Sequence, residues 1–184
     1  MQESDYLKGR TDLIQRFKQL PLLKSLEDVY LKRIMELSKI RKYSAGETIT
    51  PEGAYDCWFY ILIAGAVRIV KGSDEIARLT NIGDTFGELA VIDGEARSAS
   101  VQAVDNTVCL AVDASSLGRE GMATQHVFYS VICRLFAEII ASRLRAANEE
   151  LVRLRHENAA LKGQSPAEKA SEEFVLDEGD VVWL

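Results

Sequence analysis

The spacing of apolar residues changes three times along the chain and divides its 184 residues into four parts. Residues 1–43 carry apolar positions at the three-to-four-residue interval of helices. Residues 44–124 show short apolar runs and alternations bounded by turn residues, as strands do. The helical interval returns over 125–162, and 163–184 form an acidic segment. The pattern predicts N-terminal helices, an all-β middle part, one long C-terminal helix and a tail.

Two helices are expected before residue 44. In the first, four apolar residues share one face until Pro21 interrupts the pattern: Leu13, Ile14, Phe17 and Leu20. The second is expected to begin at Ser25 as its N-cap, with Asp28 three residues on, and to stop near Tyr43. Its buried stripe would consist of Leu26, Tyr30, Ile34 and Leu37.

The middle part has the pattern of short strands joined by turns. An apolar run of strand length covers residues 57–63, and after a turn the apolar residues Val67 and Ile69 continue it. Turn residues at 71–74 and 81–84 mark two further connections. Two later alternations place one set of side chains on a core face: Ala99, Val101 and Ala103, then Val108, Leu110 and Val112. Several short strands at this spacing favour a β-sandwich or barrel.

The second half of the long helix carries a heptad seam. One row of the seam is formed by Leu144, Leu151 and Asn158, and the other by Ala147, Leu154 and Leu161. Such a helix can pack on its own β part, or it can pair with the same helix of a second copy. Its length of roughly 55 Å, at 1.5 Å per residue, favours pairing, because the β part is too small to cover it. We therefore expect a homodimer through this seam.

The tail, residues 163–184, begins with a linker at 163–166 and ends on an apolar tip at 181–184. It is too short for a domain. The sequence leaves open whether the tail is disordered or docks on this chain or on a partner.

Charge and composition exclude several classes of protein. The net charge of −6 argues against a nucleic-acid surface, and no apolar run approaches the roughly 18 residues of a membrane span. The polar, acidic N-terminus is not a signal peptide. Cys57, Cys109 and Cys133 each lie among apolar residues and are interpreted as reduced core thiols. We therefore expect a cytoplasmic protein that does not bind a membrane.

Signals for catalysis are absent from the sequence. The turn pattern would also suit a cupin, but a cupin metal site needs several clustered imidazoles, and the chain has only His126 and His156. The sequence contains no nucleophile elbow and no P-loop. We therefore expect neither enzymatic activity nor a bound metal.

Residues 86–103 hold the strongest candidate chemistry. Where a short helix could begin, closely spaced backbone N–H groups come from Gly87, Glu88, Leu89 and Ala90. Such a helix start binds an anion through its unpaired donors and its dipole. The Glu88 carboxylate is an acceptor suited to a sugar hydroxyl, and Asp93-Gly94 marks a tight turn.

An arginine follows at the right distance to complete an anion site. Arg97 comes seven residues after Ala90, and its planar fork matches two phosphate oxygens at once. Ser98 adds a hydroxyl donor. A glycine–glutamate pair and an arginine alone would be an ordinary turn and a surface charge, whereas the whole combination predicts a site for a small cyclic phosphate.

With Gly87-Glu88, the Ala90 position and Arg97-Ser98-Ala99 all at matching spacing, residues 86–103 resemble the phosphate-binding cassette of the cyclic nucleotide-binding domain family. The resemblance extends over about residues 20–160. It implies a mainly β fold with flanking helices, a jelly-roll-like β-roll. It also implies that Glu88 binds the ribose 2′-OH and that Arg97 and Ser98 bind the cyclic phosphate.

Among bacterial relatives, the chain looks similar to the sensor half of the catabolite activator class. Those regulators dimerise through the long helix, which closes over the base, and then continue into a helix-turn-helix domain. Only 22 residues follow Lys162 here, and they are acidic. We therefore expect no DNA binding by this chain.

The same resemblance suggests where the base would be contacted. Laying the long helix on the family's helix places Arg143, Ala147 and Asn148 near the base, and the Asn148 amide can both donate to and accept from adenine. The equally ordinary interpretation is that Arg143 and Asn148 lie on a solvated helix face.

These observations combine into one expected function and one alternative. We expect a non-enzymatic sensor of a cyclic nucleotide, cAMP first and cGMP second, that signals through its C-terminal helix to a downstream protein. The only ligand expected is the nucleotide, with no other cofactor. The alternative is a scaffold in which the β-roll and the coiled coil serve for interaction alone.

Overall fold

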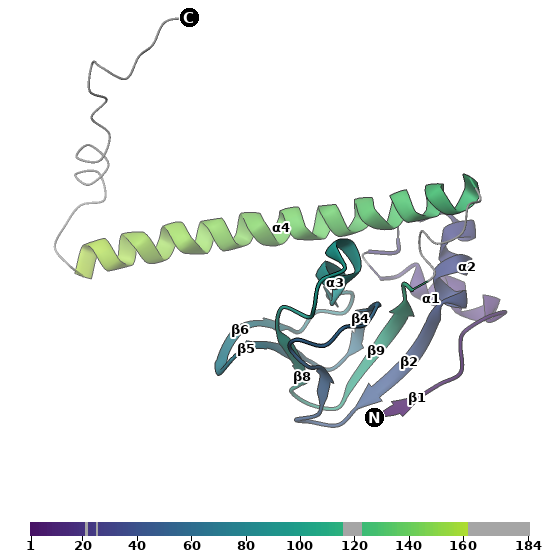
Figure 1. Ribbon diagram of the computed structural model, residues 1–184, viewed down its shortest axis with the longest axis horizontal. Helices are drawn as coiled ribbons and strands as arrows, with labels where there is room; N and C mark the ends of the chain where they lie inside the picture. The colour runs from purple at the N-terminus through teal and green to yellow at the C-terminus, as the bar shows by residue number, and fades with distance from the viewer. Residues whose placement is uncertain (21, 25, 116–122, 162–184) are drawn as a thin grey trace, which may run out of the picture. The chain divides into compact units, whose positions relative to one another are not determined.

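The computed structural model describes residues 1–20, 22–24, 26–115 and 123–161 (Figure 1). The chain divides into two compact units, Met1–Leu135 and Phe136–Leu184. The described strands and short helices belong to the first unit, and the second holds most of the long helix. Within the described ranges, no helix combines the length and hydropathy that crossing a bilayer requires.

Nine strands in the described part of the first unit form two antiparallel sheets. The five-stranded sheet has the order β1 (Gln2–Glu3), β2 (Ser38–Tyr43), β9 (Thr107–Asp113), β4 (Trp58–Ala64) and β7 (Thr85–Phe86). The four-stranded sheet has the order β3 (Thr48–Thr50), β8 (Ser100–Ala103), β5 (Val67–Lys71) and β6 (Asp74–Leu79). The predicted mainly β fold with flanking helices is confirmed.

The core lies between the two sheets. Its buried members come from both: Tyr43, Tyr60, Leu62, Val67, Phe86, Val101, Ala103, Cys109 and Ala111. Neighbouring residues of a strand face opposite sides, so Ile61 and Leu110 point away from this core, yet they too are fully buried. The five-stranded sheet is therefore covered on both faces. The alternation predicted at 108–112 described only one face of β9.

The turns between the strands follow the predicted positions. The connection at 71–74 closes the β5–β6 hairpin, where Lys71 pairs with Asp74. At 81–84 the Asp84 N–H donates to the Asn81 carbonyl at 3.0 Å. Turn chemistry is local, which is why the sequence alone located both connections.

The N-terminal helices are shorter than expected: the 3-10 helix η1 (Thr11–Leu13), α1 (Ile14–Phe17) and α2 (Asp28–Glu36). The prediction that the second helix continues to Tyr43 is wrong, because its last part is strand β2, which pairs with β9 over its whole length. At the junction the Ser38 hydroxyl donates to the Ile34 carbonyl at 2.6 Å, and ladder hydrogen bonds then take over the backbone. Ser25, the expected N-cap, lies outside the described residues, and Glu27 occupies the N-cap position.

The long helix predicted over 125–162 is confirmed as α4 (Ala123–Leu161). Within the first unit, its Phe128 stacks on Tyr30 of α2, with ring centroids 6.2 Å apart. The predicted apolar face of the N-terminal region is also buried, at Ile14, Phe17 and Leu20.

Candidate functional site

The candidate site is built around α3 (Glu88–Asp93), the short helix between β7 and β8. Gly87 is its N-cap with a φ of 82°, and Gly94 is its C-cap with a φ of 71°. Both lie in the left-handed region that favours glycine. The predicted short helix and tight turn are present, and Glu88 is 3% exposed.

The remaining members of the cassette, residues 86–103, differ in exposure. Ala90 is buried and Ala99 half-buried, whereas Leu89 and Ser98 are exposed. The structure therefore places the acid and the arginine of the cassette inside the protein and leaves the serine at the surface.

Arg97 is buried, with 3% of its side chain exposed, and its guanidinium is held by three residues. Nε donates to Asp56 Oδ2 at 3.2 Å, and NH1 donates to the Gly87 carbonyl at 2.6 Å. NH2 donates to Asp56 Oδ1 and to the Trp58 carbonyl. These four bonds leave one of the five guanidinium N–H groups for a further acceptor.

Gly87 has no room for a side chain, because Arg97 approaches its backbone closely. A Cβ on Gly87 would lie 2.6 Å from Arg97 NH1 and 3.1 Å from the Trp58 carbonyl oxygen. The glycine thus serves two purposes: it adopts a positive φ at the start of α3, and it lets the guanidinium lie against the chain.

The loop before β4 holds Arg97 by its backbone as well. The Arg97 N–H donates to the Ala54 carbonyl at 2.8 Å, and the Gly53 N–H donates to the Arg97 carbonyl at 2.9 Å. Sequence reasoning did not identify Asp56, which lies 41 residues before Arg97. The one signal in the sequence is its position directly before the apolar run at 57–63.

A second cation reaches the cassette from strand β5. Lys71 Nζ donates to the Ser98 carbonyl at 2.6 Å and forms an ion pair with Glu52 at 2.6 Å. The Glu52 backbone N–H in turn donates to Ser100 Oγ at 2.9 Å. Arg97 is the cation within the cassette, as expected, but Lys71 was not foreseen because β5 lies apart from the cassette in sequence.

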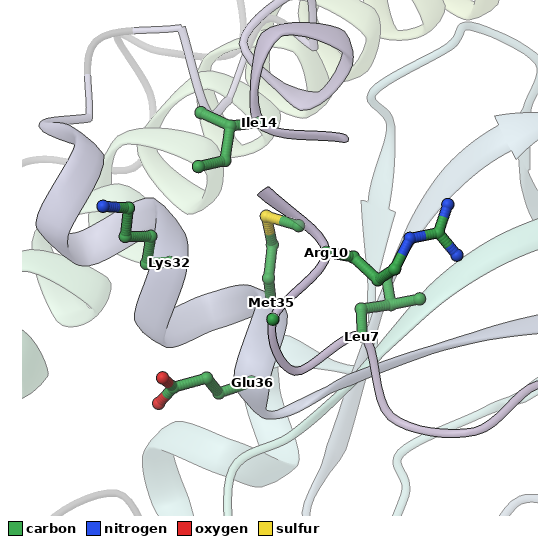
Figure 2. Close-up of a pocket in the computed structure, with 7 residues that line it drawn as sticks. Leu7, Arg10, Ile14, Lys32, Met35 and Glu36 are labelled. Carbon is green, nitrogen blue, oxygen red and sulfur yellow. The ribbon is translucent and has the colours of Figure 1, made fainter. Parts of the chain in front are cut away.

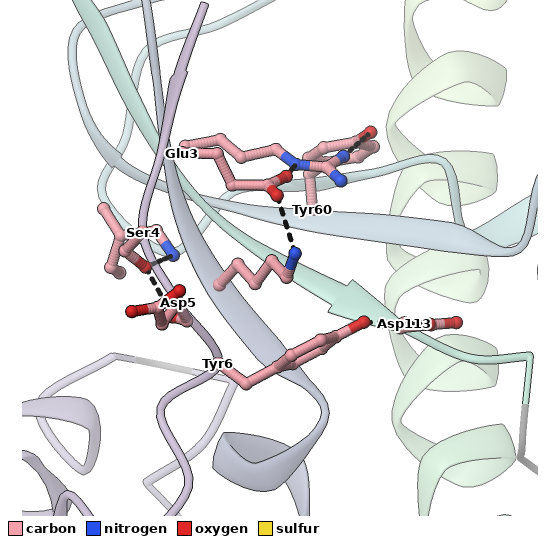
Figure 3. A network of polar contacts seen from close by, with 9 residues as sticks. Glu3, Ser4, Asp5, Tyr6, Tyr60 and Asp113 are labelled. Atoms are coloured by element: carbon pink, nitrogen blue, oxygen red, sulfur yellow. Dashed lines mark hydrogen bonds and ion pairs between the residues drawn. The ribbon is translucent and has the colours of Figure 1, made fainter.

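A third cation, Arg41, contacts the ring of Trp58 and belongs to the polar network around Glu3 and Tyr60 (Figure 3). The Arg41 guanidinium carbon is 4.0 Å from the centroid of the Trp58 ring, and Arg41 NH1 donates to the Tyr60 hydroxyl at 3.0 Å. Glu3 accepts from Arg41 Nε at 2.6 Å and from Lys39 Nζ at 2.6 Å. The hydrogen bond from Lys39, together with that from Arg41, holds the pKa of the Glu3 carboxyl below its ordinary value.

The residues predicted on the long helix lie in the second unit. Arg143 and Asn148 are on α4, and their contact with a base stays a prediction. The leucines of the predicted seam have exposed side chains: Leu144, Leu151, Leu154 and Leu161. Pairing through this seam, including Ala147 and Asn158, also stays a prediction.

The three cysteines occupy different environments, which corrects the expectation of three core thiols. Cys109 is buried, and burial raises the pKa of its thiol to about 12. Cys133 is half-buried, but Cys57 is exposed. Cys57 stands between Asp56 and the inward-facing start of β4, and the apolar run around it gave no sign that its own side chain faces solvent.

A small cavity of about 90 Å³ is lined by residues that lie outside the cassette. These residues are Leu7, Gly9, Arg10, Ile14, Lys32, Met35 and Glu36 (Figure 2). Ligand pockets usually measure about 300 Å³ or more, so this cavity is not a nucleotide site.

Known proteins are similar to part of this chain. The model of the cyclic nucleotide-binding domain matches residues 40–122. The cAMP-dependent protein kinase regulatory subunit of Emericella nidulans is 36% identical over 105 residues, 56% of this chain and 24% of that protein. Human cGMP-dependent protein kinase 2 is 30% identical over 102 residues, 52% of this chain and 13% of that protein. The chain spans about a quarter of the length of the fungal relative and less of the human one.

The fold is also that of a solved regulator. The crystal structure of Thermus thermophilus catabolite activator protein is similar with a TM-score of 0.57 and 26% identity, covering 79% of this chain and 81% of that one. The resemblance drawn from the cassette residues is confirmed. Residues 40–122 therefore match the cyclic nucleotide-binding domain, and the chain is similar over about half of its length to the cAMP-dependent protein kinase regulatory subunit.

Proposed function

We propose that this chain is a non-catalytic sensor that binds a cyclic nucleotide in the cassette and signals through α4. The observation that carries the proposal is the Arg97 guanidinium, buried beside the start of α3 in a domain of this family. A buried cation is costly unless an anion compensates it. Here Asp56 compensates the charge, and a cyclic phosphate is an anion of the right size to share the guanidinium through its remaining N–H.

Each part of the nucleotide has a candidate partner. Arg97 would bind the phosphate through its remaining N–H, with the Ser98 hydroxyl and the backbone N–H groups at 87–90 as further donors. Glu88, buried on α3, would accept from the ribose 2′-OH. These roles come from the resemblance, and the burial of both charged groups supports them.

We propose cAMP as the preferred ligand, with cGMP as the second candidate. A cAMP-dependent protein kinase regulatory subunit and a cGMP-dependent protein kinase are each similar to about half of this chain. The amide of Asn148 on α4 offers both a donor and an acceptor to the edge of adenine. Arg143 is the other base-contacting candidate on that helix.

Isothermal titration calorimetry with cAMP, cGMP and 5′-AMP tests this function. 5′-AMP is the matched control, because it has the base and sugar of cAMP but an open phosphate of different charge and shape. We expect saturable binding of cAMP, weaker binding of cGMP and weaker binding still of 5′-AMP. No binding of either cyclic nucleotide by the folded protein would overturn the proposal and favour the scaffold alternative.

A further inference from the structure

The N-terminal segment forms an additional strand on the edge of the five-stranded sheet. Gln2 and Glu3 pair with Lys42 and Arg41 of β2 in antiparallel register. The Ser4 N–H donates to the Ile40 carbonyl at 2.9 Å, and the Ile40 N–H donates back to Ser4 Oγ at 2.9 Å. Further on, the Leu7 N–H donates to the Ser38 carbonyl at 2.9 Å, and Leu7 is buried. The segment is therefore fixed to β2 by backbone bonds at both ends.

Glu3 is the link between this added strand and the side chains of the sheet. Its two carboxylate oxygens each accept a bond of 2.6 Å, one from Lys39 and one from Arg41 (Figure 3). The side chains are partly shielded, with exposed fractions of 28% for Glu3 and 13% for Arg41. A planar guanidinium held by a carboxylate on one side and a hydroxyl on the other has little freedom to rotate, and the Tyr60 hydroxyl is that second partner.

Trp58 connects Arg41 to the cassette arginine. Its indole ring lies under the Arg41 guanidinium, a cation–π contact at 4.0 Å. Its backbone carbonyl accepts from Arg97, and its backbone N–H donates to Asp56 Oδ1 at 2.9 Å. Trp58 therefore contacts Arg41 with its side chain, and Arg97 and Asp56 with its backbone.

We propose that Arg41 is a positioning residue for Arg97, and that Glu3 on the N-terminal strand sets Arg41 for this role. The inference rests on the proposed function, because its readout is nucleotide affinity. The Glu3–Arg41 pair fixes the Trp58 ring, the fixed ring holds the Trp58 carbonyl, and that carbonyl orients the Arg97 guanidinium. Ligand affinity is highest when the binding groups are already in place, so loosening this chain of contacts weakens binding.

The proposal is tested in a Trp183→Phe background. The sequence has two tryptophans, so Trp58 is the one that remains. In this parent we expect Glu3→Gln and Arg41→Ala each to weaken cAMP binding by about 3- to 10-fold, which lies within the range of coupling through contact networks. Lys39→Gln is the matched control, since Lys39 shares the Glu3 carboxylate but not the Trp58 ring, and we expect a smaller change.

A double-mutant cycle separates positioning from general destabilisation. If Glu3 acts through Arg41, the Glu3→Gln, Arg41→Ala double variant binds cAMP no more weakly than Arg41→Ala alone. Arg41→Lys keeps the charge facing Glu3 but loses the flat guanidinium, so we expect a wild-type unfolding midpoint with weakened binding. Trp58 fluorescence without ligand should shift in Glu3→Gln and Arg41→Ala and stay nearly unchanged in Lys39→Gln.

Failure of this inference and failure of the proposed function give different results. If the Trp183→Phe parent binds no cyclic nucleotide, the proposed function falls. If the parent binds cAMP and the folded Glu3 and Arg41 variants bind it equally well, or if their effects simply add, the positioning role is overturned. An unchanged Trp58 emission in Glu3→Gln overturns the link from the N-terminal strand.

Discussion

Arg97 and Asp56 form an ion pair between two segments that are 41 residues apart in sequence. Arg97 Nε donates to Asp56 Oδ2 at 3.2 Å, and NH2 donates to Oδ1 of the same carboxylate. The carboxylate thus takes up two N–H groups of the guanidinium that the proposed function assigns to a phosphate. A bound nucleotide has to share Arg97 with Asp56, and two anions that share one cation repel each other.

Removing the charge of Asp56 should tighten nucleotide binding. Asp56→Asn keeps a hydrogen-bond acceptor near Arg97 but removes a like charge close to the phosphate. A repulsion of about 1 kcal/mol corresponds to roughly fivefold in affinity. We expect cAMP to bind Asp56→Asn about fivefold more tightly in calorimetry. Glu75→Gln, which makes the same change at an exposed pair with Arg78, should leave the affinity unchanged. Weaker binding by Asp56→Asn would show that the carboxylate positions Arg97 instead of competing for it.

Truncating Arg97 should remove most of the affinity. Loss of one partner of a buried, hydrogen-bonded charge pair costs about 2–5 kcal/mol. At tenfold per 1.4 kcal/mol, Arg97→Ala should weaken cAMP binding by about 30-fold or more. Arg78→Ala removes an exposed arginine of the same domain and should have no effect. A folded Arg97→Ala protein with unchanged calorimetric affinity would show that the site assignment is wrong.

Discrimination at the ribose tests Glu88. If its buried carboxylate accepts from the 2′-OH, 2′-deoxy-cAMP loses that charge-assisted hydrogen bond at a cost of about 1–3 kcal/mol. Wild type should therefore bind cAMP more tightly than the deoxy analogue by about fivefold to 100-fold. Glu88→Gln should lose most of this preference. Equal affinity of the wild type for the two ligands would remove Glu88 from the ribose role.

Substitution of each of the two glycines that flank α3 distinguishes the effect of backbone strain from the effect of a contact with Arg97. Both have a positive φ, so Gly87→Ala and Gly94→Ala should each lower the free energy of unfolding by about 1 kcal/mol. A Cβ on Gly87 would meet Arg97 NH1 at 2.6 Å, whereas one on Gly94 would meet no described atom within 4 Å. Only Gly87→Ala should therefore weaken cAMP binding. Equal binding by the two variants would mean that Arg97 adjusts freely.

The parts of the fold that the sequence predicts best are those with one clear local pattern. The apolar run at 57–63 became β4, and the alternation of Val101 and Ala103 became β8. The error at residues 38–43 has a physical cause: these six residues fit a helix locally, but pairing with β9 decides their structure. No local pattern contains that partner strand.

The candidate site divides in the same way. Residues 86–103 are contiguous, so their glycine, acid and arginine were visible as one motif. Asp56 and Lys71 reach the cassette only through folding of the sheets, and Arg41 reaches Trp58 from a strand first expected to be helical. Spacing along a chain predicts neighbours within one element, whereas the contacts that hold Arg97 join separate strands and loops.

Pairing of α4 between two copies is the last prediction. The seam residues Leu151 and Leu154 are 47% and 48% exposed, and a second copy of the helix would cover them. In a dimer these leucines would face their counterparts in the second copy, so replacing them by aspartates places like charges across the seam. Leu151→Asp with Leu154→Asp should therefore convert a dimer into a monomer of 20.5 kDa in light scattering. Val152→Asp changes an exposed apolar residue of the same helix outside the seam and should remain dimeric. If the partner helix also completes the nucleotide site, the double variant binds cAMP more weakly than Val152→Asp does. A wild-type monomer at high concentration, with and without cAMP, would show that α4 does not pair and that the seam leucines serve a single chain.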